Sequence, residues 1–213
     1  MVTQSGGICS IPAMIPEIQK CYSWFSQGNV SGTPSQISQT RDVFEARSDH
    51  FLNDLSRQKI LGLEFAHLLV SVIKEVGNNC FDHNLGQWQD IPGCWFEYGL
   101  QENHIWVVIS DRGQGVFSSL KRILPELNSD QQAIETAFTK RISGRKPERR
   151  GNGLKFVRNI INGGENRGLL FLSGSGKMCL GRLASETSKL VDLSAQPSQN
   201  RGTFSLILWE KDQ

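Results

Sequence analysis

The strongest constraint on this chain is a helical segment, residues 61–84, whose apolar face turns polar towards its end. Its apolar residues recur at steps of four, three and four: Leu61, Phe65, Leu68 and Val72. This spacing is typical of an amphipathic helix that packs one face against a core. The same face then continues with three polar residues: Glu75, Asn79 and Asp82. Because a buried charge requires a partner, either this end of the helix faces a cavity, metal or ligand, or the helix emerges into solvent at Glu75.

Three motifs further along the chain favour the cavity. In chain order they are Asp111-x-Gly113-x-Gly115, Gly151-x-Gly153-Leu154 and Gly202-Thr203. The first follows an apolar strand, the second leads from a basic segment into a helical pattern, and the third opens the last apolar strand. Backbone N–H groups at such a helix start can hold phosphate. Each motif alone is often only a turn, but the helix and the three motifs in this order form a strong signal.

The helix and the three motifs resemble the ATP-binding domain shared by gyrase, heat-shock chaperone, histidine kinase and MutL proteins, the GHKL family. The N box corresponds to Glu75-x-x-x-Asn79 with Asp82 and His83, and the other motifs correspond to the two glycine boxes and the terminal strand. The resemblance covers residues 61–209, and the end of the N box is most similar to that of the stand-alone anti-sigma-factor serine kinases. Other nucleotide signatures are absent, since the chain has no G-x-x-x-x-G-K-[ST] and no G-x-G-x-x-G after its first strand.

The resemblance implies a role in adenine binding for the residues around Asp111. An adenine ring presents an exocyclic amine, whose hydrogen bond a carboxylate at the end of a buried strand can accept. Asp111 matches the family's adenine-binding aspartate, and Thr203 matches the threonine that helps to hold this edge of the ring through water. Gly113 and Gly115 would let the backbone pass close to the base. Asp82 is either a water-mediated nucleotide contact or a surface carboxylate.

The resemblance also implies which residues handle the phosphates. Asn79 matches the ligand of Mg²⁺, a cation that keeps several waters and bridges phosphate oxygens. Glu75, one helical turn earlier, matches the general base that activates water or a hydroxyl group. The second glycine box supplies further nucleotide contacts: Gly151, Gly153 and Leu154. Lys146 and Arg150 are candidate charge partners for the γ-phosphate.

Several of these residues have a simpler interpretation that the sequence leaves open. His83 is either a nucleotide contact or, more often in such a position, a hydrogen-bonded residue at a helix end. The basic run in residues 140–150 is either a solvated face or a phosphate site. A glycine inside a helix, such as Gly77, lowers helix stability by about 1 kcal/mol relative to alanine. Its presence indicates either close packing against a neighbour or a position where the helix tolerates this loss. Arg149 stands where the second glycine box often has another glycine, which makes the lid geometry an open question.

Composition limits the class of protein. The chain has 213 residues, of which 38% are hydrophobic and 21% are charged, which predicts a globular protein of one domain or one domain with an extension. A net charge of +2 does not require nucleic acid or a membrane as partner, and no apolar run reaches the length of a membrane span. Five cysteines without CxxC spacing, together with the lack of a signal-peptide pattern, favour reduced thiols in the cytoplasm.

The remaining pattern divides the chain into an N-terminal extension, residues 1–40, and a domain, residues 41–213, which the resemblance implies is a histidine-kinase-like ATPase domain. The extension is expected to pack partly on the domain or on a partner. Helices are predicted over residues 42–59, 61–84, 130–141 and 154–161, hairpins over 95–110 and 168–183, and a final strand over 203–209. In the family, a mobile nucleotide lid occupies the place of residues 117–150. These elements predict an α+β, two-layer sandwich, with one mixed, mostly antiparallel sheet and helices on one face. This agrees with the Bergerat-type fold that the resemblance implies.

Two functions are consistent with the sequence. The first is an enzyme, either an ATPase or a protein serine/threonine kinase, with Glu75 as base and Mg²⁺ held by Asn79. The second is an ATP-gated binding module, in which nucleotide orders the lid and the extension to hold a partner protein. Glu75 favours the enzyme, since a pure binder would not need it. The module is favoured because no upstream segment resembles the phospho-accepting histidine box, so a complete histidine kinase is not expected. The partner or phospho-acceptor stays unidentified, and a homodimer is one option for the assembly.

Overall fold

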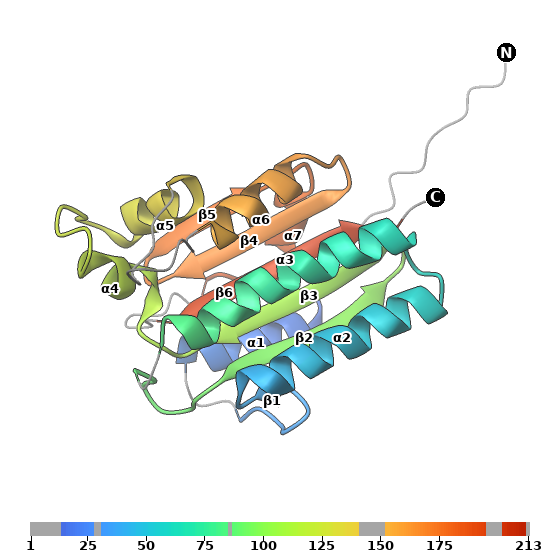
Figure 1. The fold of residues 1–213 in the computed structure, drawn as a ribbon, viewed down its shortest axis with the longest axis horizontal. Coiled ribbons are helices and arrows are strands. Elements are labelled where there is room, and N and C mark those ends of the chain that lie inside the picture. Colours follow the sequence, from blue (N-terminus) through green and yellow to red (C-terminus); the bar gives the residue numbers. More distant parts are fainter. Residues whose placement is uncertain (1–13, 28–30, 85–86, 141–151, 195–201, 212–213) are drawn as a thin grey trace, which may run out of the picture.

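Strand β3 (His104–Asp111) runs through the middle of the protein, and all of its residues are buried. In the computed structural model, which describes residues 14–27, 31–84, 87–140, 152–194 and 202–211, β3 belongs to a six-stranded sheet (Figure 1). Successive side chains of a strand point to opposite faces, and β3 is apolar at both sets of positions. The sheet therefore requires cover on both faces.

The strands lie in the order β1-β2-β3-β6-β4-β5, and each neighbouring pair is antiparallel. Besides β3 they are β1 (Ile37–Ser38), β2 (Cys94–Gln101), β4 (Arg167–Ser173), β5 (Gly176–Leu180) and β6 (Thr203–Glu210). The predicted hairpins are confirmed as β2–β3 and β4–β5, and the sheet of the described residues is antiparallel throughout where a mixed one was expected. The last strand, β6, lies between the hairpins, which places its start beside the end of β3.

One face of the sheet is covered by α2 (Arg41–Arg57), α3 (Leu63–Asp82) and α6 (Gly153–Asn162) (Figure 1). Their buried apolar residues pack against the odd-numbered side chains of β3 and β6. Within the described ranges, no helix has both the length and the apolar character needed to cross a membrane. The sheet and these helices confirm the predicted α+β sandwich.

The opposite face is covered as well, by α1 (Pro16–Gln27) and by the segment that contains α7 (Ala184–Lys189), both behind the sheet in Figure 1. Tyr22, Trp24 and Phe25 of α1 are buried in the same cluster as the even-numbered residues of β3 and β6 and as Trp95 of β2. The expectation of helices on one face was therefore incomplete. The even-numbered strand residues are as apolar as the odd-numbered ones, and covering them removes that surface from water.

A third, smaller packing unit lies at the left of Figure 1, within residues 115–140. It contains α4 (Gly115–Lys121) and α5 (Asp130–Thr139). α5 confirms the predicted helix, whose start is capped by the Ser129 side chain. α4 and α7 were not predicted, because such short helices show no periodic pattern. The remainder of the expected lid, up to residue 150, lies outside the described residues.

The buried face of α3 differs from the predicted one. Phe65 is 37% exposed and Glu75 is exposed, so the predicted stripe was wrong at these two positions. The helix instead buries a neighbouring face: Ala66, Leu69, Val70, Val72, Ile73, Val76, Gly77 and Cys80. α3 has more apolar positions than one stripe holds, and the sheet and α2 together decide which of them are covered. Asn79 lies half-buried at the edge of this face.

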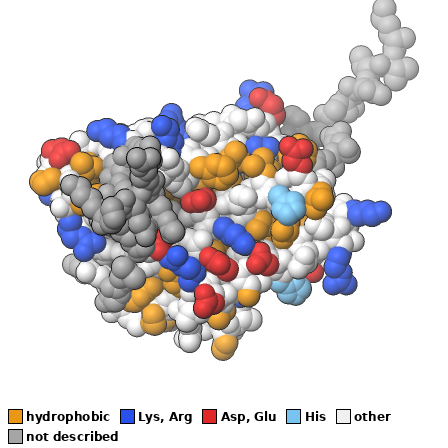
Figure 2. Space-filling view, in the orientation of Figure 1, with side chains coloured by type: hydrophobic (Ala, Val, Ile, Leu, Met, Phe, Trp, Pro, Cys, Tyr) orange, Lys and Arg blue, Asp and Glu red, His pale blue; other side chains and the backbone are white. Residues whose placement is uncertain are grey.

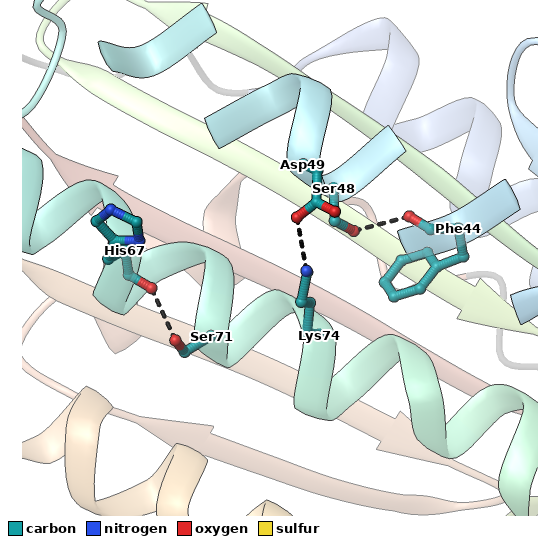
Figure 3. A network of polar contacts seen from close by, with 6 residues as sticks. All are labelled: Phe44, Ser48, Asp49, His67, Ser71 and Lys74. Carbon is teal, nitrogen blue, oxygen red and sulfur yellow. Dashed lines mark hydrogen bonds and ion pairs between the residues drawn. The ribbon is translucent and has the colours of Figure 1, made fainter. Parts of the chain in front are cut away.

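α2 and α3 are joined by an ion pair (Figure 3) and by close packing beneath it. The Lys74 ammonium of α3 lies 2.6 Å from the Asp49 carboxylate of α2. Within α2, the buried Ser48 hydroxyl donates to the Phe44 carbonyl at 2.9 Å. The Phe44 ring lies so near Gly77 that a Cβ atom at position 77 would overlap it. Because a buried ring in a close-packed core cannot easily move aside, Gly77 is explained by close packing rather than by tolerance.

Gly77→Ala is expected to lower the free energy of unfolding by about 1–3 kcal/mol through crowding against Phe44, although alanine is the better helix residue by about 1 kcal/mol. Ser71→Ala is the matched control, because Ser71 lies on the exposed side of the same helix (Figure 3). It should change stability by less than about 0.5 kcal/mol. Denaturant titration measures both variants, and a Gly77→Ala protein more stable than the parent would contradict the close contact.

Candidate functional site

A pocket lies where the end of α3, the end of β3 and the start of β6 meet. Of the residues predicted for the site, those that line it are Asn79, His83, Asp111, Gly115, Leu154 and Thr203. Its apolar wall consists of Val76, Val116, Leu120, Ala137 and Phe171. Two further lining residues, Asn84 and Ser119, were not predicted. The fold thus brings together residues from helices α3 to α6 and from strands β3, β4 and β6.

Asp111 reaches the pocket because of strand periodicity. It is the last residue of β3, and its odd number places its side chain on the face covered by α3. Thr203 is its antiparallel partner in β6, so the two side chains project from the same face at the same end of the sheet. The Thr203 hydroxyl donates a hydrogen bond to Asp111 Oδ2. Gly202 permits this approach, because a Cβ atom there would overlap the Asp111 carbonyl.

The Asp111 carboxylate is 2% exposed, and hydrogen bonds replace the water that it has lost. Its Oδ1 accepts from Asn84 Nδ2 and from the Gly113 N–H, each at 2.8 Å. Burial raises the pKa of Asp111 from the ordinary 3.8, while the hydrogen bonds from Thr203, Gly113 and Asn84, and to a smaller extent the neighbouring Cys80 thiol, lower this pKa in part. Each carboxylate oxygen has about two acceptor positions. The Cys80 thiol has a single proton, which it donates to the Val76 carbonyl at 3.8 Å. Oδ2 therefore takes one hydrogen bond, from Thr203, and can accept another from a ligand.

Asn84 is a site residue that the motifs did not reveal. It is 3% exposed, its Nδ2 also donates to the Cys80 carbonyl at 2.8 Å, and its Oδ1 accepts from the Gln114 N–H at 3.0 Å. Gly113 passes so close that a Cβ atom there would overlap the Asn84 side chain. Gly113 is therefore required by close approach, whereas Gly115 adopts a φ of +74° at the start of α4. The available signal was an asparagine at a helix end, where this residue type commonly bonds nearby backbone.

Glu75 and the second glycine box meet beside the pocket. Glu75 is exposed and is not among the lining residues, and its carboxylate lies against Gly153, the first residue of α6. Leu154, the next residue, lines the pocket. The other residues predicted for this region, Lys146, Arg150 and Gly151, lie outside the described residues. The structure thus places the Glu75 carboxylate next to Gly153, and Glu75 lies one helical turn before Asn79 on α3.

Asp82 and His83 lie at the end of α3 in different surroundings. Asp82 is not among the lining residues, and its carboxylate forms an ion pair with Arg41 of α2. His83 lines the pocket, and its Nδ1 lies 3.3 Å from Ser119 Oγ. The His83 carbonyl also accepts a hydrogen bond from Gln114 Nε2. His83 therefore combines a bonded position at the helix end with a place on the pocket wall.

Basic and acidic side chains are interspersed over the helical face of the molecule (Figure 2). Two pairs that join α2 to α3 are Lys74–Asp49 and Arg41–Asp82. In the part of the chain that the structure describes, no group of three or more His, Cys, Asp or Glu side chains is arranged to hold a metal ion. A metal ion bound at the pocket would therefore depend on ligands of another kind, such as the Asn79 amide oxygen.

The buried carboxyl group of Asp111 gives stability a specific pH dependence. The folded protein holds the Asp111 proton more strongly than the unfolded chain, so stability is lost as the pH rises from 3.8 through the higher folded pKa. The unfolding free energy of the parent minus that of Asp111→Asn should therefore fall across this window and level off above it. Denaturant titrations at a series of pH values measure this difference, and a value independent of pH would contradict the raised pKa.

The chain has a distant structural neighbour among the proteins of known structure. No protein-family model and no curated protein matches the chain. Among solved structures, the chain is similar to the mycobacterial sensor histidine kinase MprB, with 17% sequence identity, a TM-score of 0.35, and coverage of 70% of this chain and 74% of that chain.

Proposed function

We propose that the protein binds ATP with Mg²⁺ in this pocket and either hydrolyses the nucleotide or transfers a phosphoryl group to a partner protein. The observation that carries the proposal is the buried Asp111 carboxylate, held at the pocket wall by Thr203, Gly113 and Asn84. A buried carboxylate that can still accept a hydrogen bond suits a ligand that presents an N–H group. The exocyclic amine of adenine is such a group.

The walls around Asp111 suit a flat aromatic ring. Val116, Leu120 and Phe171 provide apolar surface at the pocket. Ligand pockets typically combine such walls with a few fixed polar groups that set orientation. Burial of the adenine ring against these side chains would supply affinity, and the hydrogen bond to Asp111 would supply selectivity.

Asn79 and Glu75 suit the phosphate end of the nucleotide. Asn79 lines the pocket, and its amide oxygen is a ligand of the kind that Mg²⁺ accepts. The bound metal would neutralise charge on the phosphates. Glu75, one turn earlier on α3, lies against Gly153, where α6 begins. There it would take the proton of the attacking water or hydroxyl group, with Lys146, Arg150 and Gly151 as further proposed phosphate contacts.

A second function, an ATP-gated binding module with little turnover, is favoured by one observation. The Glu75 side chain is exposed and is not among the residues that line the pocket. A general base has to come within hydrogen-bond reach of the group that it deprotonates. If Glu75 stays outside that reach, bound nucleotide would act by shifting the protein towards a conformation that a partner protein prefers.

Asp111→Asn tests the adenine site. The carbonyl oxygen of the new side chain can still accept from Asn84 and Gly113, and the Thr203 hydroxyl can reverse to accept from the new amide, so the fold should be kept. ATP affinity should fall by about 10- to 100-fold, because a hydrogen bond to a charged group is worth about 1.5–3 kcal/mol. Calorimetry measures the change, with Asp192→Asn as the control at an exposed acid. Binding at the parent's affinity would show that the pocket is assigned wrongly.

Two substitutions one helical turn apart separate the two functions. Glu75→Ala should leave the affinity for Mg·ATP nearly unchanged and lower turnover by a factor of about 10²–10⁴, because a general base acts mainly in the transition state. Asn79→Ala should weaken ATP binding when Mg²⁺ is present and much less when it is absent. Assays with γ-labelled ATP, alone and with candidate partner proteins, follow the label. A parent without turnover, in which only Asn79→Ala has an effect, would rule out the enzyme and leave the module.

A further inference from the structure

The Asn84 side chain joins three segments of the pocket. Its Nδ2 donates to the Cys80 carbonyl, in the last turns of α3, and to Asp111 Oδ1, at the end of β3, both at 2.8 Å. Its Oδ1 accepts from the Gln114 N–H at 3.0 Å, directly before α4. An amide rotated by half a turn would place its oxygen against two acceptors and its NH₂ against a donor. The three contacts therefore determine the orientation of this side chain.

This orientation determines which oxygen of Asp111 a ligand can use. Oδ1 accepts from both Asn84 and the Gly113 N–H, so its acceptor positions are filled. Oδ2 accepts from the Thr203 hydroxyl and has capacity for one more donor. The absence of a Cβ atom at Gly113 lets Asn84 occupy this place. A ligand can therefore donate a hydrogen bond to one carboxylate oxygen, Oδ2, which is held in a fixed position.

We propose that Asn84 is a positioning residue that gives the pocket its selectivity for a nucleobase carrying an amino group. The inference rests on the proposed ATP-binding function and identifies how Asp111 is aimed at the base. Without Asn84, the carboxylate would lose one of the two donors that hold Oδ1 and would rotate more freely. A site with a fixed acceptor discriminates against a ligand that lacks the matching donor, because the buried acceptor is then left unpaired.

The positioning role and a merely structural role predict different results. If Asn84 only held the turn after β3, its loss would weaken every nucleotide to the same extent. If it positions Asp111, its loss affects nucleotides with the amino group far more than those without it. ATP and purine riboside 5′-triphosphate differ in this group alone, so the ratio of their dissociation constants isolates the contribution of the Asp111 contact.

The experiment measures the Kd of both nucleotides, with Mg²⁺, for the parent and for Asn84→Leu, which keeps a similar shape and removes the hydrogen bonds. The parent should prefer ATP by about 10- to 100-fold. Asn84→Leu should reduce this preference to about threefold or less, mainly by weakening ATP. Asn84→Ala is a second, smaller substitution, and thermal melting shows whether each variant is folded. The matched control is Asn166→Leu, because Asn166 Nδ2 bonds the Glu210 carbonyl at 3.1 Å at the opposite end of the sheet, and it should keep the parent's ratio.

The outcomes separate this inference from the proposed function. A folded Asn84 variant that keeps the parent's ratio, or that weakens both nucleotides equally, would overturn the inference and leave ATP binding in place. If both Asn84 variants unfold, Asn84 is required for the stability of the fold, and this result would also overturn the inference that it positions Asp111. A parent that binds neither nucleotide would overturn the proposed function itself. Combined with Asp111→Asn, Asn84→Leu should cause no further loss of preference, because both substitutions act through the same carboxylate.

Discussion

The burial of the Asp111 carboxylate is the constraint on which the rest of the site depends. An ionisable group removed from water is tolerated only with hydrogen-bond donors around it. Three segments supply them: β6 with Thr203, the turn after β3 with Gly113, and the end of α3 with Asn84. The strand order brings these segments together, because β6 lies directly beside β3. The fold and the pocket are therefore linked through one side chain.

The next residue along the chain links the same strand end to the other face of the sheet. Arg112 forms an ion pair with Asp90 at 2.5 Å, and its guanidinium donates to the Trp24 carbonyl at 3.2 Å while lying over the Trp24 ring. Adjacent residues of an extended chain project to opposite sides, so Asp111 faces the pocket and Arg112 faces α1. The first described helix is thus packed against the strand that carries the site.

Much of the fold could be predicted because its signals are local. The hairpins appear in the sequence as apolar runs separated by turn residues, and Gly77 signals a close helix contact that the Phe44 ring explains. The predicted face of α3 was less accurate, since Phe65 is partly exposed and Glu75 lies outside the pocket wall. Asn84 was missed because its role depends on a residue of β3 that is distant in the chain.

The sequence by itself determined most of the helices and strands long enough to show a period, α1 excepted, and it marked Asp111 and Thr203 as residues at strand ends. These properties depend on the order of neighbouring residues, which a sequence records directly. Only the tertiary structure decided that α1 covers the second face of the sheet, that Glu75 lies against Gly153, and that Asn84 holds Asp111. Each of these depends on how segments far apart in the chain pack against one another, and the local pattern of residues does not specify that arrangement.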